Sequence, residues 1–251
     1  MLSMLLLPLM QLAAQQPDAG QIMSKARDLS MSGSLSANVS LTITEKGGAT
    51  RNRTISMATK SYPDGLEKRF IRFMEPADVR GTAMLIVDNE KTADEMWIYL
   101  PALKKVRRIV STEKGKSFMS SEFSNADISS PPVTDFIHWH FENSGKDNLW
   151  IIESVPVNED KADEYGYSRR ISYISMDKNQ VQKIEFYNFD NELFKVIEIR
   201  SILVLPDGKY FIKDMLASNV ITNRKSELLF SNINEGTKIE DTYFSLQNLE
   251  R

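Results

Sequence analysis

The sequence predicts a mainly β protein built on one large antiparallel sheet with few helices. Apolar and polar residues alternate with a period of two in many short segments, of which residues 39–44 are a clear case. Turn-forming residues separate these segments at short intervals. Short connections join antiparallel neighbours, because parallel strands need long crossovers. A sheet of ten or more twisted strands curls, splits or closes, and periodicity leaves open which of these occurs.

The expected elements are then placed in chain order. Residues 17–32 have the apolar spacing of a helix, and Gly33 is placed to end it. Strands follow at 39–44, around Ile55 and Met57, and at 69–74, with glycine-containing turns at 46–49 and 63–65. Ten further strands are expected at 83–88, 94–100, 105–110, 134–142, 148–155, 167–176, 181–189, 193–205, 209–222 and 227–233.

Two short helical segments complete this list. Ser124 and Asp127 have the spacing of a capping box, in which an N-cap hydroxyl is followed three residues later by a carboxylate. A plain turn is the alternative for so short a match. The second candidate is the segment after Asp241. We find no repeat, low-complexity tract or interdomain linker, so residues 17–251 are expected to form a single domain.

Residues 1–16 have the features of a secretory signal peptide. They carry no charge, are mostly long apolar side chains, contain Pro8, and end with Ala13 and Ala14 before two glutamines. The segment is too short to span a bilayer, which needs about 20 apolar residues. A positive amino-terminal region is missing, and a buried first helix is the alternative. The leader predicts export.

Composition excludes several classes of protein. The 251 residues include 31 basic and 34 acidic side chains, giving a net charge of −3, whereas nucleic-acid coats are strongly basic. The absence of cysteine excludes disulfides, thiolate metal sites, cysteine nucleophiles and lipid acylation of the exported chain. We therefore expect a protein without nucleic-acid partners or cofactors that moves freely after export.

The two histidines, His138 and His140, are the only candidate metal ligands with a pattern. With Glu142 they share one face of the expected strand, and such a set could ligate zinc in a hydrolytic site. The alternative is the solvated face of an amphipathic strand, with Ile137 and Trp139 on the other side. No phosphate-binding glycine loop, G-x-S-x-G elbow or H-E-x-x-H motif is present, so we do not expect an enzyme.

A dense apolar and aromatic middle is the feature most suggestive of function. Residues 84–87, 96–100 and 118–123 are rich in methionine and aromatic side chains. A strand buried in the core on both faces would have this composition. The functional alternative is a cavity for flexible acyl chains, which adaptable methionines suit.

A basic run follows directly. Lys104, Lys105, Arg107 and Arg108 place four positive charges within five residues. One interpretation is contact with anionic head groups, an anionic membrane or a partner. The other is a solvated edge strand that its charges protect from aggregation.

Four motifs of the sequence resemble the LolA-like family of bacterial outer-membrane lipoprotein-sorting proteins. The motifs are RFMEPADVRGTAML at 72–85, EMWIYLPALKKVRRI at 95–109, SFMSSEFSNADI at 117–128 and FSLQNLE at 244–250. The sequence departs from the family at Ser120, where glycine is common, at Glu122, and at Asn125-Ala126. A positive φ has a higher conformational energy for serine than for glycine.

The resemblance implies a large, strongly curved antiparallel sheet that forms an incomplete β-barrel, with a few helices over its mouth and an apolar interior. It also implies a monomeric periplasmic chaperone for lipid that shields lipoprotein acyl chains, or another lipid, on the way to the outer membrane. The segments 17–32 and 118–123 are the candidate lids. The expected lipid-binding residues are Met84, Met96, Trp97, Ile98, Tyr99, Phe118, Met119 and Phe123.

The resemblance also implies partners, and the residues leave two rival functions open. An inner-membrane transporter and an outer-membrane acceptor are the expected partners. The first rival is an accessory subunit that docks on a lipid exporter of the resistance-nodulation-division type through Lys104, Lys105, Arg107 and Arg108. The second rival is a metal-dependent hydrolase that uses His138 and His140.

Overall fold

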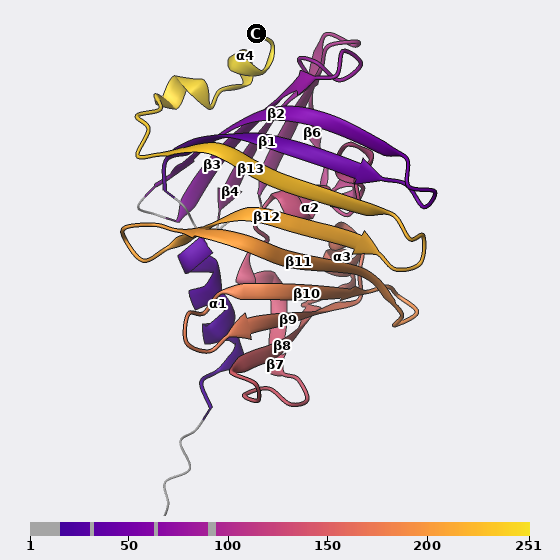
Figure 1. Ribbon diagram of the computed structural model, residues 1–251, viewed down its shortest axis with the longest axis vertical. Coiled ribbons are helices and arrows are strands. Elements are labelled where there is room, and N and C mark those ends of the chain that lie inside the picture. The colour runs from indigo at the N-terminus through magenta and orange to yellow at the C-terminus, as the bar shows by residue number, and fades with distance from the viewer. Residues whose placement is uncertain (1–15, 31–32, 63–64, 90–93) are drawn as a thin grey trace, which may run out of the picture.

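The computed structural model describes residues 16–30, 33–62, 65–89 and 94–251. The predicted leader lies outside these residues except for Gln16. The described chain forms one open, curved antiparallel sheet of 13 strands (Figure 1). The order across the sheet is β6-β5-β4-β3-β2-β1-β13-β12-β11-β10-β9-β8-β7. The strands are β1 Leu35–Thr44, β2 Thr50–Ser61, β3 Leu66–Glu75, β4 Ala83–Asn89, β5 Glu95–Leu100, β6 Lys105–Ile109, β7 Phe136–His140, β8 Leu149–Pro156, β9 Arg169–Ser175, β10 Val181–Tyr187, β11 Leu193–Val204, β12 Tyr210–Asn219 and β13 Lys225–Glu235.

The predicted fold class is confirmed, and every expected strand is present. Neighbours in the sheet are neighbours in the sequence, except that β1 pairs with β13 and that β6 and β7 lie at opposite edges. The chain between β6 and β7 must therefore cross the sheet. Residues 110–135, here called the inner segment, make this crossing over the concave face. The inner segment contains the short helices η1 Ser111–Glu113, η2 Phe118–Ser120, α2 Asn125–Ile128 and η3 Val133–Asp135.

Alternation places one apolar set of side chains on the concave face and another on the convex face. The concave set joins residues of the inner segment, including Phe118, Phe123 and Ile128, in the largest core cluster. The predicted capping box of α2 is confirmed, since Ser124 Oγ accepts from Asp127 N at 3.1 Å and Asp127 Oδ2 accepts from Ser124 N at 2.7 Å. The inner segment thus fills much of the hollow of the sheet.

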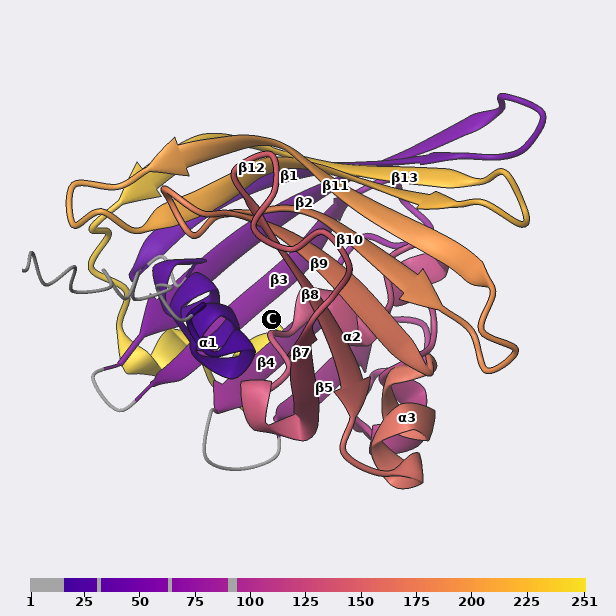
Figure 2. The ribbon, with the colours of Figure 1, turned by 90° about the horizontal axis from the view of Figure 1, so that it is seen from below.

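Helix α1, Ala19–Ser30, lies across one end of the concave side (Figure 2). Asp18 Oδ1 accepts a hydrogen bond from Gln21 N at 3.0 Å, which satisfies one of the free N–H groups at the start of the helix. Gly33 has a φ of +68°, as its predicted place after the helix requires. The apolar stripe of α1 packs on Trp150, Ile152 and Ile174 of β8 and β9. No helix of the described chain is long and apolar enough to cross a bilayer.

Sequence reasoning missed helix α3, Glu159–Tyr165. Its local signals are present, because Asn158 Oδ1 accepts from Lys161 N at 2.9 Å and Gly166 ends the helix with a φ of +77°. Its apolar spacing is too short to mark it as a helix, since only Tyr165 and the stem of Glu164 are buried.

The C-terminal segment covers part of the convex face. It contains η4 Asp241–Tyr243 and α4 Leu246–Leu249, where a helical segment was expected. Phe244 and Leu249 pack on Phe70 and Leu85, with Trp97 and Tyr99 beside them. Both faces of β3 to β5 are therefore buried, which explains the dense apolar composition of this part of the sequence.

Helix α4 provides a matched test of this convex cluster. Leu249 is fully buried, whereas Leu246, one turn earlier, is 44% exposed. We expect Leu249→Ala to lower the free energy of unfolding by about 2–5 kcal/mol, because it leaves a cavity. Leu246→Ala should change it by no more than about 0.5 kcal/mol. Urea unfolding of both variants checks this, and equal effects would contradict the packing described.

Candidate functional site

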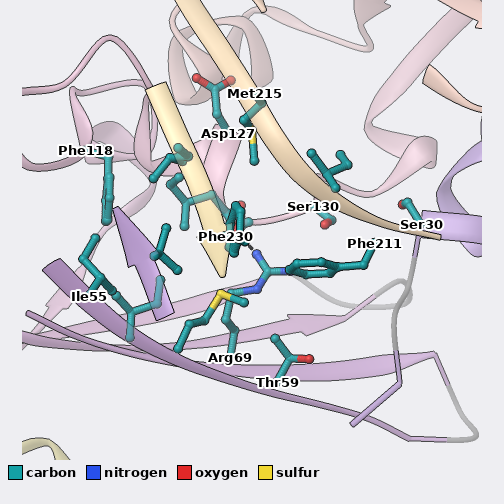
Figure 3. A pocket seen from close by; sticks show the side chains of 17 residues that line it. Ser30, Ile55, Thr59, Arg69, Phe118, Asp127, Ser130, Phe211, Met215 and Phe230 are labelled. Atoms are coloured by element: carbon teal, nitrogen blue, oxygen red, sulfur yellow. Dashed lines mark hydrogen bonds between the residues drawn. The ribbon is translucent and has the colours of Figure 1, made fainter. Parts of the chain in front are cut away.

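The main cavity lies between the concave face of the sheet and the inner segment (Figure 3). Its volume is about 150 Å³. Inward-facing residues of β1, β2, β3, β12 and β13 form one wall, and the inner segment and the end of α1 form the other. The lining residues are Ser30, Val39, Ile55, Met57, Thr59, Arg69, Ile71, Phe118, Asp127, Ile128, Ser129, Ser130, Phe211, Ile212, Met215, Leu228 and Phe230.

Most of this lining is apolar and supplies no reactive group. Phe211 and Phe230 meet edge to face, with ring centroids 5.0 Å apart. The side chains of Arg69 and Asp127 are the charged members of the lining, and both are paired. Asp127 binds the buried Lys195 of β11 at 2.6 Å. Arg69 binds Glu67 at 2.6 Å and donates to the carbonyl oxygen of Ile128. These contacts hold the inner segment on the sheet, so the cavity suits an apolar ligand.

Helix α1 is fixed at the end of this cavity by Arg27. The guanidinium donates to Asp88 of β4 at 2.8 Å and to the carbonyl oxygen of Pro131 at 3.0 Å. Both charged side chains are buried, with 8% and 6% of their surface exposed. Asp88 also accepts from Ser130 N at 2.9 Å. One buried carboxylate therefore ties together the sheet, α1 and the end of the inner segment.

A second buried carboxylate, Asp94, faces Asp88 across the β4–β5 hairpin. The register pairs Val87 with Glu95, which places Asp88 and Asp94 opposite each other. Asp94 Oδ2 has no hydrogen-bond partner among the described residues, and the nearest cation, Lys114, is 3.9 Å away and binds Glu164 at 2.7 Å. Burial, and then the charge of Asp88, raise the pKa of Asp94 to about 7. Burial also raises the pKa of Asp88, against the opposing effect of Arg27.

The structure brings one of the expected lipid-binding residues, Phe118, into the cavity lining. Four others are buried in the same core cluster without reaching the cavity, and Met119 packs beside them. These four are Met84, Met96, Ile98 and Phe123. Trp97 and Tyr99 lie on the convex face, under the C-terminal segment. Lipid contact by the residues outside the lining stays a prediction.

The backbone at positions 119 and 120 is left-handed, with φ of +50° at Met119 and +64° at Ser120. At a positive φ the backbone of serine has a higher conformational energy than that of glycine, the residue common at position 120 in the family. Hydrogen bonds from the sheet hold the strained turn. Arg53 donates to the carbonyl oxygen of Met119, and Arg224 donates to that of Ser120 at 3.0 Å and pairs with Glu122 at 2.7 Å. The candidate lid 118–123 is thus anchored to β2 by Arg53 and to the β12–β13 turn by Arg224.

The basic run lies on the edge strand β6 and its turn, and none of its four charged residues lines the cavity. Arg107 pairs with Glu113 at 2.7 Å, and Arg108 pairs with Glu95 at 3.2 Å. Lys104 and Lys105 are exposed. An exposed, charged edge strand is one of the two interpretations given by the sequence.

Both histidines serve the packing of α1 and η3 through hydrogen bonds. His138 Nε2 lies 3.0 Å from the carbonyl oxygen of Val133, and Nδ1 lies 2.8 Å from Ser154 Oγ. His140 bonds the carbonyl oxygen of Pro17 at 2.8 Å and Ser144 Oγ at 2.9 Å. A metal ligand needs a free ring nitrogen, and here all four are occupied.

The expected three-residue face is also incomplete, because β7 ends at His140 and Glu142 lies beyond it. The predicted strand over 134–142 is too long. No group of three potential ligands occurs among the described residues. The exposed face of β7 carries Ile137 and Trp139 instead of the histidines, so the solvated-face interpretation is wrong as well.

Sequence reasoning missed most of the cavity lining. Met57, Ile71, Phe211, Met215 and Phe230 come from strands scattered over the chain. Each is the inward residue of an ordinary alternating strand, and alternation marks two faces without saying which one is concave. Their proximity is set by the pairing of β1 with β13, which joins the two ends of the chain.

A family model described as "-like: Uncharacterized protein" matches residues 65–251, which is more than half of the chain. The chain belongs to this family. No curated protein matches the sequence.

Three solved structures share the fold over almost the whole chain. A putative outer membrane lipoprotein-sorting protein domain from Vibrio parahaemolyticus is 24% identical, with a TM-score of 0.84, covering 93% of this chain and 98% of its own. A DUF1329 family protein from Desulfovibrio piger is 26% identical, with a TM-score of 0.81, covering 92% and 97%. A LolA superfamily protein from Nitrosomonas europaea is 17% identical, with a TM-score of 0.70, covering 92% and 98%. The resemblance to LolA-like proteins is confirmed, and the fold is that of the LolA superfamily.

The buried carboxylate pair gives a pH-dependent prediction. Because the pKa of Asp94 is raised to about 7 in the folded chain, the folded state binds a proton that the unfolded state has already lost above pH 4. The stabilising effect of that proton is complete below pH 4 and is lost as the pH rises through 7. Asp94→Asn removes this titration.

We therefore expect the free energy of unfolding of Asp94→Asn to depend less on pH between 4 and 7 than that of the unchanged protein. Urea unfolding at a series of pH values measures the difference. Asp177→Asn, at an exposed turn, is the control and should follow the unchanged protein. Parallel pH profiles for Asp94→Asn and the unchanged protein would contradict a raised pKa.

Proposed function

We propose that this protein is a periplasmic carrier that binds the acyl chains of a lipoprotein, or another lipid, in the cavity and carries them toward the outer membrane. The observation that carries the proposal is the apolar cavity between the curved sheet, the inner segment and α1. An apolar interior with few polar groups suits a ligand that gains affinity by leaving water.

The size of the cavity indicates a closed state. A cavity of about 150 Å³ is as large as one known to hold benzene, and an acyl chain of a lipid is much longer. Binding therefore requires that the side chains inside the sheet separate. The sheet is held by hydrogen bonds between strands, whereas α1 and the inner segment are held mainly by side chains. We infer that these two elements move and that the strands stay in place.

A closed empty state also makes release feasible. Each buried methylene contributes about 0.8 kcal/mol, so a two-chain lipid in a rigid open cavity would be bound too tightly for transfer. Core contacts that form again when the lipid leaves offset part of this affinity. The Arg27–Asp88 and Arg69–Ile128 contacts contribute to the closed state in the same way.

The comparisons support transport by binding. The Vibrio parahaemolyticus structure is described as a putative outer membrane lipoprotein-sorting protein domain. The leader expected at residues 1–16 supports export to the periplasm, and the mostly apolar lining of the cavity suits acyl chains. An inner-membrane transporter and an outer-membrane acceptor remain the partners that we propose.

A variant that fills the cavity tests the proposal. Met215 lines the cavity and is only half-buried, so Met215→Trp should fold while it blocks the space. We expect uptake of a fluorescent fatty acid, and the lipid recovered by organic extraction and mass spectrometry, to fall about tenfold or more, because the ligand loses several buried methylenes.

The matched control is Met74→Trp. Met74 is 45% exposed and does not line the cavity, so the same substitution there should leave lipid uptake unchanged. Normal uptake by Met215→Trp, or the absence of any bound lipid in the unchanged protein, would overturn the assignment of the cavity.

Movement of α1 can be measured with two spin labels, because the chain has no cysteine. Lys25 of α1 and Lys178 of the β9–β10 turn are exposed, and each can be replaced by cysteine. We expect the distance between the labels to increase when fatty acid is added, since α1 must leave the concave side. A pair at Lys105 and Lys178, both on the sheet, should not change. An unchanged distance from Lys25 in the lipid-bound protein would show that α1 is not the lid.

A further inference from the structure

The turn between β5 and β6 presents an exposed leucine on a rigid support. Leu103 N donates to the carbonyl oxygen of Leu100 at 3.0 Å, and Lys104 N donates to that of Pro101 at 3.2 Å. These bonds and the pairing of Leu100 with Lys105 fix the turn at the edge of the sheet. Leu103 is 62% exposed, the highest value for a large apolar side chain in the described chain. The fold thus holds this side chain in water without packing it.

Unpaired positive charge flanks the leucine. The two arginines of β6 are neutralised by Glu113 and Glu95, and Arg108 also lies over the ring of Trp97 at 5.9 Å. Lys104 and Lys105, by contrast, have no acidic partner in the part of the chain that the structure describes. Two lysines with free charge therefore stand next to the exposed leucine.

The neighbouring loop does not cancel this charge. Residues 76–81 lie against the turn, since a side chain at Gly81 would meet Pro101 Cγ at 3.3 Å. This loop contributes one acid, Asp78, and one base, Arg80, both of them exposed. Arg80 Nε donates a hydrogen bond to the carbonyl oxygen of Met74 at 3.0 Å. Met74 is 45% exposed. The excess positive charge of the surface stays with Lys104 and Lys105.

We propose that the β5–β6 turn docks this protein on a lipid bilayer that contains anionic lipids, with Leu103 inserted between head groups and Lys104 and Lys105 on the lipid phosphates. Each partner in a stable protein interface contributes roughly 800 Å² of surface, and the surface of a narrow convex turn with one leucine is much smaller. A deformable bilayer accommodates such a turn, and the negative surface of anionic lipid complements the lysines. Lysine also keeps its ammonium in water while its stem lies along apolar surface.

Docking by two lysines and one leucine is weak and reversible. It would bring the carrier to a membrane surface without a covalent attachment. The turn lies at the outer edge of the sheet and is absent from the cavity lining. Membrane docking and binding of lipid in the cavity can therefore fail independently of each other.

Vesicle flotation with the full chain tests the docking surface. We expect far more of the protein to float with vesicles of phosphatidylcholine that contain about 30% phosphatidylglycerol than with vesicles of pure phosphatidylcholine. Added salt should lower the amount that floats. Lys104→Gln with Lys105→Gln should lower the partition coefficient, obtained from the bound fraction at a series of lipid concentrations, about 25-fold, at about fivefold for each lysine. Leu103→Ser should lower it about tenfold or more.

Matched controls come from a different turn of the sheet. Val204 at the end of β11 is 61% exposed, and Lys178 and Lys209 lie in turns of the same sheet. Val204→Ser and Lys178→Gln with Lys209→Gln should float like the unchanged protein. Unchanged fatty-acid uptake by the Leu103 and lysine variants shows that they are folded. Equal binding to both kinds of vesicle, or equal losses in the control variants, would overturn the proposal.

Discussion

The whole structure depends on one constraint, which is that the concave face of a large open sheet must be covered. Each strand from β1 to β6 and from β10 to β13 contributes apolar side chains to the core cluster inside the hollow. Exposing these side chains to water would remove the apolar burial that stabilises the fold. The chain covers this face with its own crossing between the two edge strands. Because β6 and β7 lie at opposite edges, residues 110–135 have to cross the sheet, and their core contacts place this crossing on the concave side. The cavity is the space that this crossing leaves unfilled.

Polar contacts of charged side chains then hold the inner segment and α1 in place on the sheet. Lys195 with Asp127, Arg69 with the carbonyl oxygen of Ile128, and Arg27 with Asp88 each join the sheet to the inner segment or to α1. A buried ion pair adds little net stability compared with apolar packing, but it fixes geometry and is costly to break on one side. Elements held in this way occupy one defined position, and the proposed binding of lipid requires them to leave it. That combination is what a carrier with a closed empty state needs.

The histidine pair and the aromatic strand β5 show what a local pattern leaves out. The histidine pair had the residue types of a metal site, yet Val133, Ser154, Pro17 and Ser144 use its ring nitrogens. These partners come from η3, β8 and the loops, and no local pattern announces them. Trp97 and Tyr99 show the same difficulty, because a strand with two apolar faces does not reveal that one of them meets the C-terminal segment.

By itself, the sequence determined the class of fold, every strand of the sheet, helix α1, the capping box of α2 and the resemblance to LolA-like proteins. These features depend on local periodicity, on turn and cap residues, and on motifs that are contiguous in the chain. Only the tertiary structure decided which face of each strand is concave, which residues line the cavity, and that Asp88 and Asp94 face each other. Those outcomes depend on the pairing of β1 with β13 and on the path of the inner segment, and both are contacts between residues far apart in the chain.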